Sequence, residues 1–91
     1  HNYTFNFMNK ARRQELEDVI DYLDDAIDRL EEIRDDEEDS YDNLNEGLQN
    51  SKTGAGMLDA ISQLDGFCAD IQDVKGRVTD MKLNRKPKKG G

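Results

Sequence analysis

The side chains of this 91-residue chain that could take part in chemistry are mostly carboxylates. Between Glu15 and Glu46, sixteen residues are acidic and only two, Arg29 and Arg34, are basic. Residues 35–39 form an unbroken run of five acids. Such charges repel one another, and near the end of a helix they also oppose its macrodipole. An arrangement that folding does not favour indicates a surface that binds a basic partner, or else a solvated face that serves solubility alone.

The partner that this surface fits best is a protein with a basic site. Regularly spaced carboxylates can take the place of phosphates in the site of a nucleic-acid-binding protein. We therefore expect a protein–protein contact whose charge complementarity inhibits a nucleic-acid-handling enzyme. The acidic residues expected to make the contact are Asp28, Glu31, Glu32, Asp35, Asp36, Glu38, Asp39 and Asp42.

Calcium is the other ligand that clustered carboxylates can bind. A calcium-binding loop that began at Asp35 would place Asp39 and Glu46 at ligand positions. Ser40 would then stand where the motif needs glycine for its sharp turn. No helix boundary is expected at that point either. The sequence therefore predicts no metal site and no cofactor.

The residues needed for catalysis are scarce. Apart from His1 the chain has no histidine. This excludes Ser-His and Cys-His pairs, and also metal sites that contain histidine. Cys68 is the only cysteine, and its place in an apolar stripe is typical of a small core residue. Two helices side by side offer no concave pocket to shift carboxylate pKa values. We expect a protein that is not an enzyme.

Apolar residues recur every three or four positions in the first half of the chain, the spacing of one helix face. This spacing predicts a helix over residues 9–43, and its phase continues through Glu37 and Tyr41. Val19, Ala26 and Ile33 widen the stripe. The stripe itself consists of Leu16, Ile20, Leu23, Ile27 and Leu30.

A second amphipathic helix is predicted over residues 52–83. Asparagines and glycines between positions 45 and 56 indicate a break before it, and Ser51 or Thr53 is a suitable N-cap. Leu58 and Phe67 broaden its apolar face. The stripe consists of Met57, Ile61, Leu64, Cys68, Ile71, Val74, Val78 and Met81.

Two long amphipathic helices with a short connection predict an all-α fold, an antiparallel two-helix hairpin. Each helix carries a single stripe, so a lone hairpin buries little. We therefore expect two hairpins to pair as a homodimeric four-helix bundle. The expected divisions are an arm over residues 1–8, the hairpin over 9–84 with its loop at 44–51, and a tail over 85–91.

The two ends of the chain have their own composition. Tyr3, Phe5 and Phe7 alternate with polar residues, as in an extended strand, and can either cap the open end of the hairpin or dock on another chain. Residues 82–89 hold five basic side chains without interleaved aromatics, which is typical of a flexible, basic tail. Such a tail allows only weak, non-specific contact with nucleic acid.

The segment from Leu30 to Ser51, LEEIRDDEEDSYDNLNEGLQNS, resembles short helical-hairpin proteins of bacteria and their phages. Those proteins carry an acidic EIRDEE run, an aromatic residue, a DNLPEGLQ segment and a serine-capped second helix. The likeness covers residues 16–71, and Asn45 stands where the family often has proline. The family has no assigned activity. The resemblance implies a hairpin of microbial or phage origin and no particular chemistry.

The lone thiol and the lack of a long apolar run predict a reduced, aqueous location, the cytoplasm of a bacterial host. The leading functional hypothesis is an acidic helix that occupies a basic surface of a protein partner. The main alternative is a structural or assembly adaptor that uses its apolar stripes and aromatic arm. Salt separates the two, because ionic strength weakens charge-driven binding far more than apolar docking.

Overall fold

The computed structural model describes residues 8–83, and all of its regular structure is helical. Helix α1 spans Lys10–Asp42, α2 spans Glu46–Gln49 and α3 spans Lys52–Lys82. No strand occurs within the described residues, so the predicted all-α class is confirmed. The aromatic arm with Tyr3, Phe5 and Phe7 and most of the basic tail lie outside the described part.

Asparagine side chains begin the first two helices. The Oδ1 atom of Asn9 accepts a hydrogen bond from the backbone N–H of Arg12 at 2.8 Å. The Oδ1 atom of Asn45 does the same for Leu48 at 2.9 Å. Each cap satisfies a backbone donor that has no partner inside the first helical turn. Asn45 therefore starts the short helix α2.

The connection between the long helices is more ordered than the sequence indicated. The stretch predicted as a break contains α2, and the side-chain amide of Gln49 donates to the carbonyl oxygen of Tyr41 at 3.0 Å. Gly54 and Gly56 lie inside the first turns of α3, within the helix predicted over residues 52–83. Gly54 is buried, and a Cβ atom there would overlap the carbonyl group of Gln49. Glycine at position 54 thus allows α2 to pack on the start of α3.

The role predicted for Ser51 is only partly correct. Ser51 is the residue that precedes α3, but its side chain makes no capping hydrogen bond. Its hydroxyl instead donates to the carbonyl oxygen of Leu48, at the end of α2. Serine hydroxyls compete in this way for nearby backbone groups. The side chain therefore closes the preceding turn and leaves the first N–H groups of α3 uncapped by serine.

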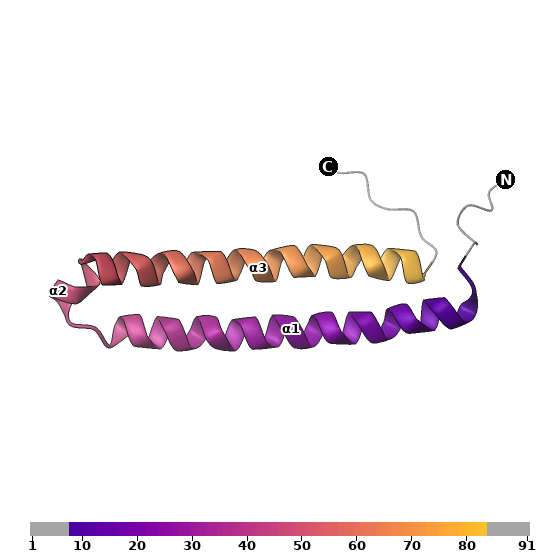
Figure 1. The fold of residues 1–91 in the computed structure, drawn as a ribbon, viewed down its shortest axis with the longest axis horizontal. Helices are drawn as coiled ribbons and strands as arrows, with labels where there is room; N and C mark the ends of the chain where they lie inside the picture. The colour runs from indigo at the N-terminus through magenta and orange to yellow at the C-terminus, as the bar shows by residue number, and fades with distance from the viewer. Residues whose placement is uncertain (1–7, 84–91) are drawn as a thin grey trace.

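Helices α1 and α3 lie side by side and run in opposite directions, with α2 at the turn between them (Figure 1). The molecule measures 64 × 27 × 12 Å, so its thickness is that of a single helix. Buried and half-buried residues recur along both helices at spacings of three and four, and we call these residues the seam. In α1 and the turn that follows it, the seam residues are Leu16, Ile20, Leu23, Ile27, Leu30, Arg34, Glu37, Tyr41 and Leu44.

The seam of α3 departs from the predicted stripe near its end. It follows a strict heptad pattern, in which Lys75 and Lys82 take the places expected for Val74 and Met81. Val74 is 38% exposed and Met81 is 50% exposed, so their predicted burial is wrong. The lysine stems cover the seam while their ammonium groups reach water and carboxylates. The α3 seam is Gly54, Met57, Ile61, Leu64, Cys68, Ile71, Lys75, Val78 and Lys82.

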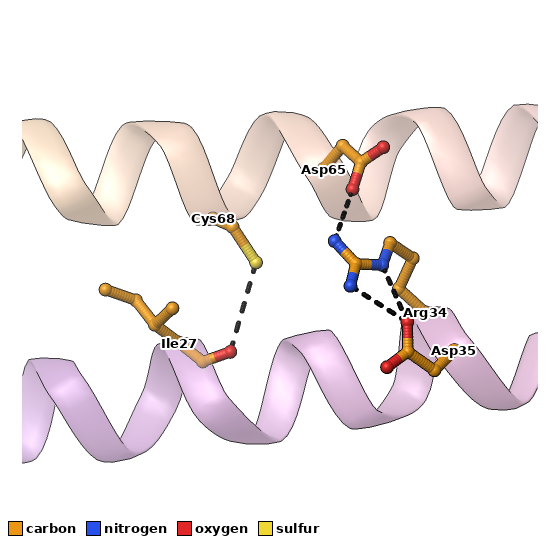
Figure 2. A network of polar contacts seen from close by, with 5 residues as sticks. All are labelled: Ile27, Arg34, Asp35, Asp65 and Cys68. Atoms are coloured by element: carbon orange, nitrogen blue, oxygen red, sulfur yellow. Dashed lines mark hydrogen bonds and ion pairs between the residues drawn. The ribbon is translucent and has the colours of Figure 1, made fainter.

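The buried core is small. Among the described residues, the buried apolar side chains are Ile27, Ile61 and Cys68. The Sγ atom of Cys68 lies 4.0 Å from the carbonyl oxygen of Ile27, a long and weak thiol contact across the seam (Figure 2). A single layer of two helices cannot enclose side chains from all directions. Most apolar residues of the seam therefore keep part of their surface in contact with solvent.

Candidate functional site

The carboxylates of α1 lie in three columns that run along one side of the helix. In each column an acidic residue recurs every seven positions, which is two helical turns. The three columns are neighbours because their members are three or four residues apart. We call this surface the acidic face. Its residues are Asp21, Asp28, Asp35 and Asp42; Asp18, Asp25, Glu32 and Asp39; and Glu17, Asp24, Glu31 and Glu38.

Two columns of the acidic face lie away from α3, and the third, which contains Asp24 and Glu31, borders the seam. Of its twelve residues, only Asp24 and Glu31 are half-buried, and the others are exposed. At 1.5 Å of rise per residue, the face carries one carboxylate for about every 3.4 Å of helix axis. One strand of B-DNA carries a phosphate charge every ~3.4 Å along its axis. If the ion pairs within the protein are left aside, the linear charge density of the face therefore matches that of a nucleic-acid strand.

Ion pairs neutralise part of this face, mostly in its first half. Lys75 Nζ lies 2.6 Å from Asp24 Oδ1, and Lys82 Nζ lies 3.3 Å from Glu17 Oε2. Both pairs join the seam of α3 to the edge of α1. A third pair, between Arg29 and Asp25 at 3.6 Å, is fully on the surface and contributes little. In the first half of the face, ion pairs thus link α1 to α3 along one edge of the seam.

The second half of the face is different. Within residues 8–83, no ion pair involves Asp28, Glu31, Glu32, Glu38, Asp39 or Asp42. The last turn of α1 contains no basic residue that would complement its dipole. Asp39 and Asp42 are therefore placed where a helix favours cations. Packing of α1 on α3 gives no reason for these charges.

Arg34 makes the main polar contact across the seam in this region. Its Nη1 atom lies 2.9 Å from Asp65 Oδ1 of α3, and its Nη2 atom lies 2.8 Å from Asp35 Oδ1 (Figure 2). The hydrogen bonds to Asp65 and then Asp35 raise the pKa of the guanidinium above its ordinary value, because they stabilise the charged form. Asp35 is thus a structural partner of Arg34, although sequence analysis assigned it to the binding surface.

The structure brings most of the predicted binding residues together. Seven of the eight acids expected to bind a partner belong to the acidic face, and Asp36 lies beside it, outside the three columns. Glu37 is half-buried in the seam. The aromatic residues predicted to bind, Tyr3, Phe5 and Phe7, lie outside the described residues.

Sequence analysis missed the length of the face. It assigned residues from Asp28 onwards, whereas the columns begin at Glu17, Asp18 and Asp21. The signal was present in the sequence, since Asp21, Asp28, Asp35 and Asp42 recur at intervals of seven. The continuous run at 35–39 overlaps all three columns, so the period of seven is less apparent than the density of charge.

A second surface is apolar and lies on the other edge of the seam. Each of its residues directly precedes a seam residue, and the largest of them, Phe67, is 47% exposed. We call this surface the apolar face. It consists of Val19, Ala26 and Ile33 of α1 with Phe67, Val74 and Met81 of α3.

Residues 35–39, which a calcium loop would need, are part of the continuous helix α1. Within residues 8–83, no three His, Cys, Asp or Glu side chains are grouped so as to hold a metal ion. None of α1, α2 and α3 combines the length and the apolar character that a membrane crossing requires.

Comparisons of this chain with protein-family models, with curated proteins and with solved structures found no match. The acidic face and the apolar face are therefore interpreted from the charges, exposure and contacts of this chain itself.

Proposed function

We propose that this protein is a non-enzymatic binding protein whose acidic face occupies a basic surface of a partner protein. The observation that carries the proposal is the set of exposed acids of the face that form no ion pair within residues 8–83, among them Asp28, Glu32, Asp39 and Asp42. These charges are exposed, regularly spaced and unfavourable for folding. A basic partner turns the same charges into favourable contacts.

Charge complementarity gives such a complex specific properties. Long-range attraction raises the rate of encounter, and the spacing of the columns fixes the register of the two surfaces. The charge spacing of the face, similar to that of a nucleic-acid strand, favours a partner that normally binds DNA or RNA phosphates. The protein would inhibit such an enzyme or binding protein by occupying its phosphate-binding surface. On the resemblance to bacterial and phage hairpins, we expect this partner in the bacterial cytoplasm.

A displacement assay tests the proposal. A purified bacterial DNA-binding protein is loaded with a short fluorescent duplex, and the release of the duplex is followed by anisotropy as this protein is added. The wild-type chain is expected to release the duplex. The face variant carries Asp28→Asn, Glu32→Gln, Asp39→Asn and Asp42→Asn. We expect it to release the duplex only at a protein concentration at least about tenfold higher.

A matched variant controls for net charge. It carries Glu15→Gln, Glu46→Gln, Asp59→Asn and Asp70→Asn, four exposed acids that lie outside the acidic face. Both variants lose the same number of negative charges. Equal loss of displacement in the two would show that net charge alone matters, and the proposed face would then be wrong.

The second candidate function is an assembly adaptor that binds through apolar contacts. The observation in its favour is the exposure of Ile33, Phe67 and Met81 on one edge of the helix pair. We also propose, from the small core, that the hairpin pairs with a second copy to form a four-helix bundle. An adaptor that binds through its apolar face would keep its affinity for the partner as salt is raised.

A further inference from the structure

The apolar face is continuous across both helices. Viewed along their common axis, successive residues of α1 rotate in one direction about the helix, and those of the antiparallel α3 rotate in the opposite direction. Corresponding heptad positions of the two helices therefore lie on the same side of the seam. Val19, Ala26 and Ile33 share that side with Phe67, Val74 and Met81. The ion pairs of Asp24 and Glu17 with the seam lysines occupy the opposite side.

The exposure of this face is large for so small a protein. Ile33 is 53% exposed and Met81 is 50% exposed, and they lie near the two ends of the face. The molecule is one helix thick, and no side chain among the described residues is fully buried. Stable domains have at least two packed layers that share one core. A second layer on the apolar side would cover the exposed residues of this face.

The distribution of charge indicates how a second layer would be oriented. The half of the helix pair near α2, residues 26–71, carries thirteen acidic and three basic residues. The opposite half, residues 8–25 and 72–83, carries eight acidic and six basic residues. Two copies that stack with the same ends together would bring both strongly acidic halves into contact. Stacking with opposite ends together places each acidic half beside the nearly balanced half of the other copy.

We propose that the apolar face binds the apolar face of a second copy of this chain, with the two copies related by a two-fold axis perpendicular to the helices. Such an interface is self-complementary, since the same six residues come from each copy. Around the axis, α1 lies on α1 of the other copy and α3 lies on α3. Phe67 then faces the region of Val74 in the second copy.

The acidic faces remain free in this dimer. Glu31 and Glu38 border the seam on the side away from the apolar face, and Asp39 and Asp42 lie on the outer surface of α1. The dimer therefore presents two acidic faces, one on each outer side. The dimer does not rest on the proposed binding of a basic partner. Either can fail without the other.

Sedimentation equilibrium of purified protein tests the interface. The wild-type chain is expected to sediment as a dimer, and Phe67→Lys is expected to shift it to a monomer, because a charge would be placed in the centre of the interface. The matched control is Leu58→Lys, since Leu58 is equally exposed, at 48%, but lies on the opposite side of the seam. The control is expected to remain a dimer.

Circular dichroism of the same samples separates dissociation from unfolding. If Phe67→Lys loses helicity as well, its sedimentation at low temperature and the conservative Val74→Ser variant still report on dimerisation. A wild-type monomer at micromolar concentration would overturn the proposal. So would a dimer that Leu58→Lys dissociates and Phe67→Lys does not.

The orientation has its own measurement. A spin label is attached at exposed Lys52 through a genetically incorporated reactive residue, which leaves Cys68 untouched. Lys52 lies at the α2 end of α3, so opposite-end stacking separates the two labels by about 55 Å along the axis. Same-end stacking would place the two spin labels at the same position along the helix axis. A short label–label distance by pulsed electron resonance would contradict the proposed axis.

Discussion

At the scale of single residues, several side chains act in ways that their chemical type does not indicate. Lys75 and Lys82 are charged but belong to the seam, whereas Val74 and Met81 are apolar but exposed. The heptad phase decides this, because a shift of one residue along the helix turns a side chain by about 100°. Residue type alone favoured Val74 and Met81 for the core, which is why the predicted stripe was wrong there.

The seam lysines give a prediction about stability. Lys75→Leu is expected to stabilise the protein by about 1 kcal/mol, because a polar residue at a seam position of a coiled coil costs stability. The control is Arg77→Leu, since Arg77 is exposed and forms only a surface pair with Asp73 at 3.2 Å. Thermal melts of both variants measure the effect. A lower melting temperature for Lys75→Leu would mean that its pair with Asp24 outweighs the gain in apolar burial.

Gly54 gives the second prediction at this scale. Gly54→Ala is expected to destabilise the protein by about 2 kcal/mol or more, because the new Cβ would overlap the carbonyl group of Gln49. Gly56→Ala is the matched control, since a Cβ there meets nothing within 4 Å and alanine favours the helix by about 1 kcal/mol. Chemical denaturation measures both changes. Equal stabilisation by the two alanines would show that α2 does not pack closely on α3.

At the scale of the helices, spacing predicted much and local chemistry predicted less. The three-and-four spacing of Leu16, Ile20 and Leu23 indicated a long helix, and the all-α class followed from it. The one-turn helix α2 was missed because four residues show no period. Its start depends on a hydrogen bond from Leu48 to the side chain of Asn45.

The acidic face was predicted in part for a related reason. Density of charge identified the residues from Asp28 to Asp42, but the helix geometry was needed to arrange them in columns. It also separated Asp35, which pairs with Arg34, from its neighbours. The partner of Arg34 on the other helix, Asp65, is 31 residues away in sequence, and no local pattern connects the two.

The macrodipole of α1 gives a prediction about this helix. The face variant, with Asp28, Glu32, Asp39 and Asp42 neutralised, is expected to be more stable than the wild type by roughly 1 kcal/mol at low salt. The gain should shrink as salt screens the charges. Melting curves at several ionic strengths measure it. Reduced stability would instead mean that these carboxylates form structural pairs in the folded protein.

At the scale of the whole molecule, two opposite edges of one thin helix pair carry different surfaces. The apolar face leaves the core incomplete on one side, and the acidic face places costly charges on the other. A dimer through the first surface would complete the fold and display the second surface twice. Two acidic faces on one particle would also raise the avidity for a partner with repeated basic sites.

The most direct test of the central claim is the affinity for a basic partner as a function of salt. The wild-type protein is titrated onto the DNA-binding protein used for displacement, and the dissociation constant is measured over a series of salt concentrations. We expect the affinity to fall steeply as salt rises, and the face variant to show a shallower slope and weaker binding at low salt. An affinity that is independent of salt, or a slope unchanged in the face variant, would contradict binding through the acidic face.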